Sequence, residues 1–219
     1  MTYEDLILIL YVFSFIPATV SVYNLVFKTT LRNISSHQVF NMPQMNDKVS
    51  ILIPARNEEK NIGTLIELLK YQTFQNFEVL ILDDNSTDTT YETAKNLTNG
   101  DERFKIIKGR DLPKGWLGKN FACHQLAELN DGKYLLFMDA DVLPSHWVIE
   151  KAIRNILTAK LDALSIFPTQ KINSFGELLV VPLMQWFLLS FLPLNFVRYF
   201  NSSAFTAANG QFMLFRKEA

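Results

Sequence analysis

Short apolar runs alternate with helix-like segments over most of this chain, and this alternation limits the possible folds more than any other feature. The strand candidates are residues 49–54, 77–82, 104–108, 134–138 and 161–167. The helix candidates, with apolar residues at helical spacing, are residues 58–71, 87–97, 120–129 and 145–157. Strands that alternate with helices need crossover connections, so we expect an α/β domain with a mostly parallel sheet and flanking helices.

Polar residues follow three of the predicted strands directly. They are, in chain order, Arg56 and Glu58, Asp83 and Asp84, and Asp139 and Asp141. Ligands of parallel sheets bind at the carboxyl ends of the strands, so we expect these side chains to line one crevice. One cluster has a competing interpretation. Residues 84–86 (Asp-Asn-Ser) could equally cap the next helix, with Ser86 as the cap, because Asp, Asn and Ser are preferred there.

The Asp139-Ala140-Asp141 sequence has the chemistry of a divalent-cation site. Mg²⁺ and Mn²⁺ prefer oxygen ligands and bind through one or two carboxylates together with substrate phosphates. Such a cation neutralises the charge that develops on a departing diphosphate. Arg56 and Lys119 offer positive charges for phosphate oxygens, and Asp83 or Asp84 could accept hydrogen bonds from a base or a ribose.

Composition excludes several other classes of function. The 21 basic and 22 acidic residues leave no positive footprint for nucleic acid. One cysteine, Cys123, and three scattered histidines provide neither a disulfide framework nor a zinc site. The first strand ends in Pro-Ala-Arg-Asn instead of a glycine-rich dinucleotide loop, which argues against an oxidoreductase. A response-regulator receiver would not explain the strand that precedes the paired Asp residues or the apolar N-terminus.

The N-terminus has the properties of a membrane anchor. Residues 6–27 carry no charge, which matches the roughly 20 apolar residues that cross a bilayer. The alternative is a cleaved secretory signal, but the start is acidic (Glu4, Asp5) and no small-residue cleavage site follows. Lys28 and Arg32 follow the run, so the positive-inside rule places the rest of the chain in the cytoplasm of a membrane-bound protein.

A second apolar stretch, residues 178–197, is also uncharged and long enough to span. A crossing would separate the segment 209–215 from the catalytic domain, so we expect a helix that lies in the membrane interface over residues 176–200. A buried core helix is the alternative. The expected organisation is therefore an anchor (1–28), a linker (29–48) and one domain (49–219) that contains the interfacial helix.

Four ordered motifs resemble family 2 glycosyltransferases of the GT-A fold, and more closely the bacterial membrane-bound branch associated with hopanoid and carotenoid glycosylation. The motifs are VSILIPARNEE, ILDDNSTDTT, GWLGKNFAC and LLFMDAD, which begin at residues 49, 81, 115 and 135. The similarity covers about residues 49–170 and returns at 208–217. It implies a hexosyltransferase-type enzyme that moves a sugar, with inversion, from a nucleotide-sugar donor (UDP-linked) to a membrane-associated lipid acceptor, with Mn²⁺ or Mg²⁺ as cofactor.

The resemblance also implies roles for individual residues. Asp139 and Asp141 would be the catalytic Asp-x-Asp motif, with Asp141 as the first candidate for direct metal ligand. Lys119 would lie near the diphosphate, although its glycine-containing segment taken alone reads as a plain loop. The residues implied in nucleotide binding are Pro54, Ala55, Arg56 and Glu58, together with Asp83 and Asp84 for the base and the ribose.

One part of the family pattern is missing from this sequence. An inverting transfer needs a general base, which in the family is an Asp of a Glu-Asp pair beyond the Gly-Gln-Phe strand. The acids that follow Asp141 here have another context; they are Glu150, Asp162, Glu177 and Glu218. We therefore expect either a C-terminally truncated enzyme, or an inactive membrane-tethered protein that keeps nucleotide binding or serves a partner.

Overall fold

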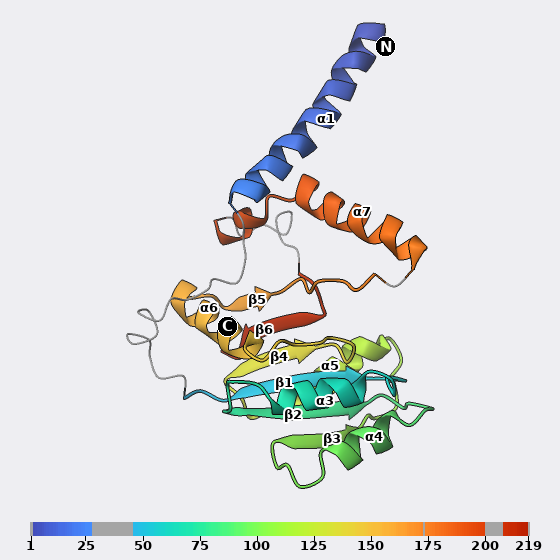
Figure 1. Ribbon diagram of the computed structural model, residues 1–219, viewed down its shortest axis with the longest axis vertical. Helices are drawn as coiled ribbons and strands as arrows, with labels where there is room; N and C mark the ends of the chain where they lie inside the picture. The colour runs from blue at the N-terminus through green and yellow to red at the C-terminus, as the bar shows by residue number, and fades with distance from the viewer. Residues whose placement is uncertain (1, 28–45, 173, 200–207, 219) are drawn as a thin grey trace. The chain divides into compact units, whose positions relative to one another are not determined.

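The computed structural model describes residues 2–27, 46–172, 174–199 and 208–218, and it divides the chain into two compact units (Figure 1). The helical unit comprises Met1–Thr30 and Thr169–Ala207, and the sheet unit comprises Leu31–Pro168 and Ala208–Ala219. The second apolar stretch thus groups with the N-terminal helix. Most of the expected linker, residues 29–45, lies outside the described residues.

The sheet unit contains six strands in the order β3-β2-β1-β4-β6-β5. Strands β1, β2, β3 and β4 run parallel to one another, whereas β6 is antiparallel to both β4 and β5. This confirms the expected mostly parallel sheet. The strands are β1 (Val49–Ala55), β2 (Phe77–Asp83), β3 (Phe104–Lys108), β4 (Tyr134–Met138), β5 (Ala163–Ser165) and β6 (Phe212–Arg216).

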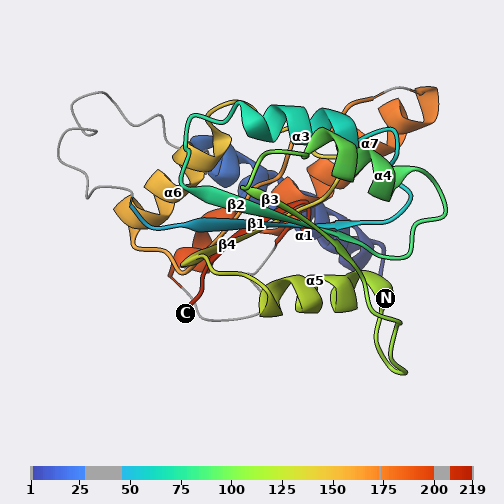
Figure 2. The ribbon, with the colours of Figure 1, turned by 90° about the horizontal axis from the view of Figure 1, so that it is seen from below.

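Helices cover both faces of the sheet (Figure 2). Helix α5 (Gly118–Glu128) lies on one face, and the other helices lie on the opposite face. The latter are α3 (Ile62–Lys70), α4 (Thr90–Leu97) and α6 (Val148–Ala159). Strand β1 is therefore covered on both sides, which explains its near-continuous apolar sequence.

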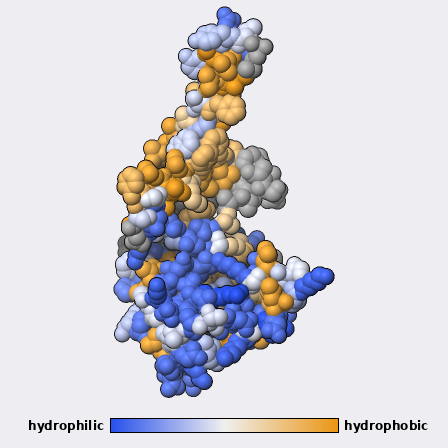
Figure 3. All heavy atoms as spheres, turned by 90° about the vertical axis from the view of Figure 1, so that its right-hand side faces the viewer, coloured by the Kyte–Doolittle hydropathy of each residue, from blue (hydrophilic) through white to orange (hydrophobic). Residues whose placement is uncertain are grey.

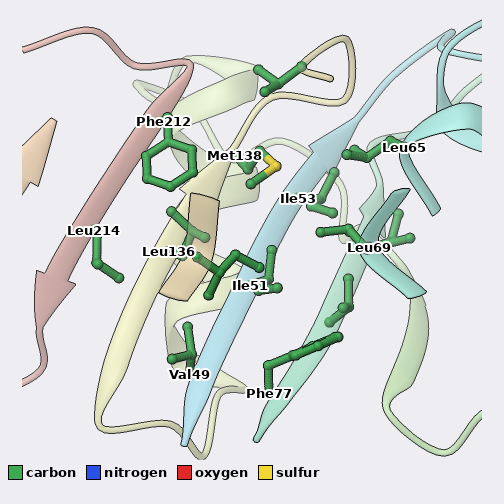
Figure 4. Close-up of a cluster of buried hydrophobic side chains, with 14 of the residues drawn as sticks. Val49, Ile51, Ile53, Leu65, Leu69, Phe77, Leu136, Met138, Phe212 and Leu214 are labelled. Atoms are coloured by element: carbon green, nitrogen blue, oxygen red, sulfur yellow. The ribbon is translucent and has the colours of Figure 1, made fainter. Parts of the chain in front are cut away.

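Alternate residues of each central strand pack into two different cores. Figure 4 shows Ile51 and Ile53 of β1 on the same side as Leu65 and Leu69 of α3, in the larger core. Leu52 points the other way, into the smaller core with α5. Burial of each such side chain contributes about 1.5–3 kcal/mol, and together they fix the position of the strand ends.

Helices α3, α4 and α6 begin later than their sequences predict, and before α3 and α4 polar residues bond to a neighbouring loop. Helix α3 begins at Ile62 and α4 at Thr90, with Thr89 as the N-cap residue. The Ser86 hydroxyl accepts from the backbone N–H of Asn57 (3.0 Å), and Asn57 Oδ1 accepts from the N–H of Thr87 (2.8 Å). The interpretation of residues 84–86 as a helix cap is therefore wrong.

The helical unit consists of α1 (Tyr3–Val26), α7 (Phe175–Phe191) and a 3₁₀ turn, Leu194–Arg198. In the described part of the chain, α1 is the one helix long and apolar enough to cross a membrane, although a signal sequence would have the same character. Helix α7 exposes most of its apolar side chains and buries only Ser190, which differs from the burial pattern of a core helix. Figure 3 shows the contrast: apolar side chains dominate the surface of the helical unit and hydrophilic ones that of the sheet unit.

A buried asparagine joins the ends of the two helices inside this unit. The Asn24 amide donates to the carbonyl oxygens of Leu189 (2.8 Å) and Leu192 (2.7 Å), and its oxygen accepts from the N–H of Leu194 (3.0 Å). The hydroxyls of Ser21 and Ser190 also lie 2.9 Å apart. Asn24 thus satisfies backbone groups that the end of α7 leaves unpaired, as an apolar environment requires.

Candidate functional site

The carboxyl ends of β2, β1 and β4 are neighbours in the sheet, and most of the predicted site residues lie there. Asp83 is the last residue of β2 and pairs with Ala55 at the end of β1. The N–H of Asp84 then donates to the Ala55 carbonyl (2.8 Å) and holds the two strand ends together. Asp83 and Asp84 are both buried.

Asp83 carries an unsatisfied buried oxygen. The residue is 6% exposed, and its Oδ1 has no hydrogen-bond partner among the residues that the structure describes. A buried acceptor without a partner costs free energy, and native proteins rarely keep one without a use for it. The described residues therefore leave the hydrogen-bonding capacity of this oxygen unused.

Asp84 meets two other elements at the same edge. Its Oδ2 lies 3.8 Å from an exposed guanidinium nitrogen of Arg56, which follows β1. Gly118, the first residue of α5, approaches so closely that a β-carbon there would lie 3.3 Å from the same oxygen. The segments after β1 and β2 and the start of α5 thus converge on one carboxylate.

The next residue, Lys119, extends this convergence to the end of β4. Its ammonium lies 2.6 Å from Oδ1 of Asp139, the first residue after β4. Lys119 and Gly118 are adjacent, so one turn of α5 links the Asp84 side of the edge to the Asp139 side. The structure thus brings Arg56, Asp84, Lys119 and Asp139 to one edge through two ion pairs and the start of α5.

The remaining predicted residues are less closely connected. Asp141 is exposed, and its carboxylate forms no hydrogen bond or ion pair with the described residues. The Glu58 carboxylate accepts from Asn61 (2.7 Å) at the start of α3. Pro54 and Ala55 belong to β1 and contribute its carboxyl end.

Two left-handed asparagines shape the loops of this edge, and sequence reasoning missed them. Asn57 and Asn85 have φ values of 56° and 55°. Asparagine adopts this conformation more readily than most residues, so its recurrence after two strands was the available signal. The Asn57 side chain and N–H bind residues 86 and 87, which couples the loop after β1 to the loop after β2.

Helix α5 also carries the cysteine, next to the Lys119–Asp139 pair. Burial raises the pKa of the Cys123 thiol, so it remains protonated at neutral pH and is not a reactive thiolate. Trp116, which precedes the helix, stacks on His124 at a centroid distance of 5.0 Å and remains half-exposed. Trp116 therefore covers the start of α5 and is not a core residue.

The acidic groups at this edge cannot enclose a metal by themselves. Within the described residues, no three His, Cys, Asp or Glu side chains gather closely enough to hold an ion. Asp139 and Asp141 alternate at the end of β4, and this donor set fits a hard cation that completes its shell with phosphate oxygens and water. The two carboxylates therefore fit Mg²⁺ or Mn²⁺ only together with an anionic ligand.

Glu150, the nearest acid after Asp141 in the chain, is already engaged. Its carboxylate accepts from the Thr73 hydroxyl (2.6 Å) and from Arg154 (2.7 Å). The hydrogen bond from Thr73, with help from Arg154, holds the pKa of Glu150 below its ordinary value. Glu150 is therefore a structural group of α6 and not a candidate general base.

Known glycosyltransferases match this chain over part of their length. The 4,4'-diaponeurosporenoate glycosyltransferase of Staphylococcus haemolyticus is 34% identical over 99 residues, which cover 45% of this chain and 25% of that protein. The UDP-Glc:alpha-D-GlcNAc-diphosphoundecaprenol beta-1,3-glucosyltransferase WfaP of Escherichia coli is 33% identical over 108 residues, or 49% of this chain and 39% of that protein. The matched segments thus span less than half of these relatives.

A solved structure and a family model match a larger part of this chain than these relatives do. The mannosyltransferase PcManGT from Pyrobaculum calidifontis, solved in complex with GDP-Man and Mn²⁺, has a TM-score of 0.69 at 14% identity over 97% of this chain and 55% of that chain. At this identity the likeness confirms the expected GT-A type of fold and no more. The model of the family described as "Glycosyl transferase family 2" matches residues 50–217. The chain therefore belongs to glycosyltransferase family 2.

Proposed function

We propose that this chain binds the nucleoside diphosphate of a UDP-sugar at the carboxyl edge of β2, β1 and β4 and supports inverting transfer of the sugar. The unpartnered, buried oxygen of Asp83 carries this proposal. It is a built acceptor beside a second buried carboxylate, an arginine and a close-packed glycine. Family membership supports the class of reaction, and this geometry supports the proposed location.

Each residue of the edge has a distinct proposed role. Asp83 and Asp84 accept hydrogen bonds from the base and the ribose, for which a buried carboxylate is a strong acceptor. Arg56 and Lys119 bind diphosphate oxygens, Arg56 as a planar fork and Lys119 as a point charge. Pro54, Ala55 and Glu58 are proposed to contact the nucleotide at the same edge. Asp139 and Asp141 are the proposed catalytic pair.

Asp141 and Asp139 would hold the divalent cation, Mn²⁺ or Mg²⁺, with Asp141 as the direct ligand. When bound, the cation neutralises charge on the departing diphosphate. In an inverting transfer the acceptor hydroxyl attacks the anomeric carbon, the bond to the diphosphate breaks, and a general base takes the hydroxyl proton. We assign no residue of this chain as that base.

We further propose that the transfer takes place at the cytoplasmic face of a membrane, on a lipid acceptor. Helix α1 has the length and hydropathy of a span, and the name of the WfaP relative specifies a diphosphoundecaprenol acceptor. Strands β5 and β6 pair with each other in one sheet, so the excursion between them must start and end on the same side of a membrane. This pairing supports an interfacial α7 within the proposed segment 176–200 over a single crossing.

Calorimetric titration of UDP and of GDP into the detergent-solubilised protein, with and without Mn²⁺, tests the donor site. We expect UDP to bind more tightly than GDP and Mn²⁺ to strengthen that binding. Asp141→Ala should abolish the effect of Mn²⁺. Glu102→Ala, an exposed acid in the turn before β3, is the matched control and should change nothing. Protein that unfolds cooperatively yet binds neither nucleotide under any condition would contradict the proposal.

A further inference from the structure

The Lys119–Asp139 ion pair joins two groups that the proposed function assigns to different ligands. Lys119 should bind an anion, the diphosphate, and Asp139 should bind a cation. In the structure the two side chains bind each other, with 2.6 Å between the ammonium and Oδ1. The lysine side chain is 56% exposed and the aspartate 23%, so the pair lies at the mouth of the site and not inside the fold.

The Lys119 ammonium occupies Oδ1 of Asp139, an oxygen that the cation would need as a ligand. A Mg²⁺ or Mn²⁺ ion lies about 2.1 Å from each ligand oxygen, which leaves no room for an ammonium on the same oxygen, and the two positive charges repel. Asp141 alone is one exposed carboxylate, and no other acidic, histidine or cysteine cluster in the described residues supplements it. Cation binding at Oδ1 of Asp139 therefore requires that the lysine leave this oxygen.

The surroundings allow the lysine to leave without a rearrangement of the fold. The α5 backbone is anchored by Phe121, Ala122 and Leu126, which are buried, and by the close approach of Gly118 to Asp84. Only the flexible four-carbon side chain of Lys119 has to rotate. A diphosphate gives it a partner with more negative charge than one carboxylate.

We propose that Lys119 keeps Asp139 closed to divalent cations until a nucleoside diphosphate binds and draws the ammonium away. This inference rests on the proposed donor site and adds an order to it: nucleotide first, cation second. Because the coupling of two ligands is reciprocal, the cation must also strengthen nucleotide binding by the same factor by which the nucleotide strengthens cation binding. Lys119 therefore couples the two ligands as well as contacting one.

The test is Mn²⁺ binding, followed by electron paramagnetic resonance of the free ion, in protein without nucleotide. Lys119→Met removes the charge and keeps the length of the side chain, and we expect it to bind Mn²⁺ about threefold to tenfold more tightly than the native protein. Lys119→Arg retains a cation and should behave like the native protein. Lys114→Met removes an exposed charge from the same loop and should alter the affinity by less than about twofold.

UDP titrations on the same samples separate this inference from the donor site itself. In the native protein UDP should raise Mn²⁺ affinity, and in Lys119→Met this enhancement should shrink. If UDP binds normally but Lys119→Met and the native protein bind Mn²⁺ equally well without nucleotide, the ordering is overturned and the donor site stands. If the native protein binds no UDP at all, the proposed function fails, and the ordering fails with it.

Discussion

Both ends of the sheet carry a buried carboxylate, but the two carboxylates differ in their hydrogen-bond partners. At the amino ends of β1 and β2, Glu78 is 3% exposed and each of its oxygens has partners. At the carboxyl ends, Asp83 is almost as buried and one of its oxygens has none. A carboxylate with every partner in place stabilises the fold, whereas the unpartnered oxygen of Asp83 is the acceptor that the proposed function assigns to a ligand.

At the amino end of the sheet, hydrogen bonds and ion pairs form a complete network around Glu78. Oε1 accepts from the Ser50 hydroxyl (2.6 Å) and from the N–H of Asp131 (2.9 Å), and Oε2 lies 3.1 Å from Lys48 and 3.2 Å from Lys105. Burial by itself raises the pKa of Glu78, but these hydrogen bonds outweigh it and lower the pKa to about 2. The network joins β1, β2, β3 and the turn before β4.

Loss of the Glu78 charge should have the largest effect on stability. We expect Glu78→Gln to lower the free energy of unfolding by about 2–3 kcal/mol at pH 7. Since folding lowers the pKa of Glu78, its contribution is complete above about pH 4.5 and disappears as the pH falls toward 2. Urea unfolding followed by tryptophan fluorescence should show the difference between variant and native protein shrinking over that range. A pH-independent difference would mean that shape and not charge sets the effect.

Asp83 should give the reverse result. We expect Asp83→Asn to weaken UDP binding by about 10–100-fold, because the variant lacks the charged acceptor that the ligand would bind. Its free energy of unfolding should change by less than about 1 kcal/mol, since the folded chain does not use the free oxygen. Calorimetry and urea unfolding on the same preparation measure both. A stability loss as large as that of Glu78→Gln would place Asp83 among the structural carboxylates and remove the contrast.

Substitution of one glycine at each end of the sheet should separate stability from nucleotide binding in the same way, with smaller effects. A β-carbon at Gly132 would lie 2.5 Å from the Ser50 hydroxyl, so Gly132→Ala should cost about 1–2 kcal/mol of stability with no effect on nucleotide binding. At Gly118 the distance to Asp84 is 3.3 Å, so Gly118→Ala should leave stability within about 0.5 kcal/mol and weaken UDP binding severalfold. Equal stability losses in both variants would contradict the proposed difference between the amino and carboxyl ends of the sheet.

The sequence predicted the strands well because burial on both faces leaves a direct trace. Residues 104–108 and 134–138 are strands as expected, and the polar residues that follow β1, β2 and β4 do lie at neighbouring strand ends. Such a trace needs only local information, namely a run of apolar residues and the point where it stops.

The choice of partners was not predictable in the same way. Ser86 is an equally good helix cap or loop acceptor, and only the position of Asn57 in space decides for the loop. Lys119 and Asp139 are separated by 20 residues, and nothing in either motif states that they bind each other. The attachment of Asn24 to the end of α7 spans a still longer separation. Periodicity records which residues are buried, but hydrogen-bond partners depend on the finished fold.

The place of β6 in the sheet has a consequence for how the protein is made. Strand β5 pairs with β6, and β6 lies between β4 and β5, so β5 waits for a partner until the ribosome has synthesised residue 216. Both α1 and α7 are synthesised before β6. If they enter the bilayer as proposed, the nascent chain is tethered to its membrane before the sheet closes. The pairing of β6 with β4, the strand that precedes Asp139, would then take place at the membrane surface rather than in free solution.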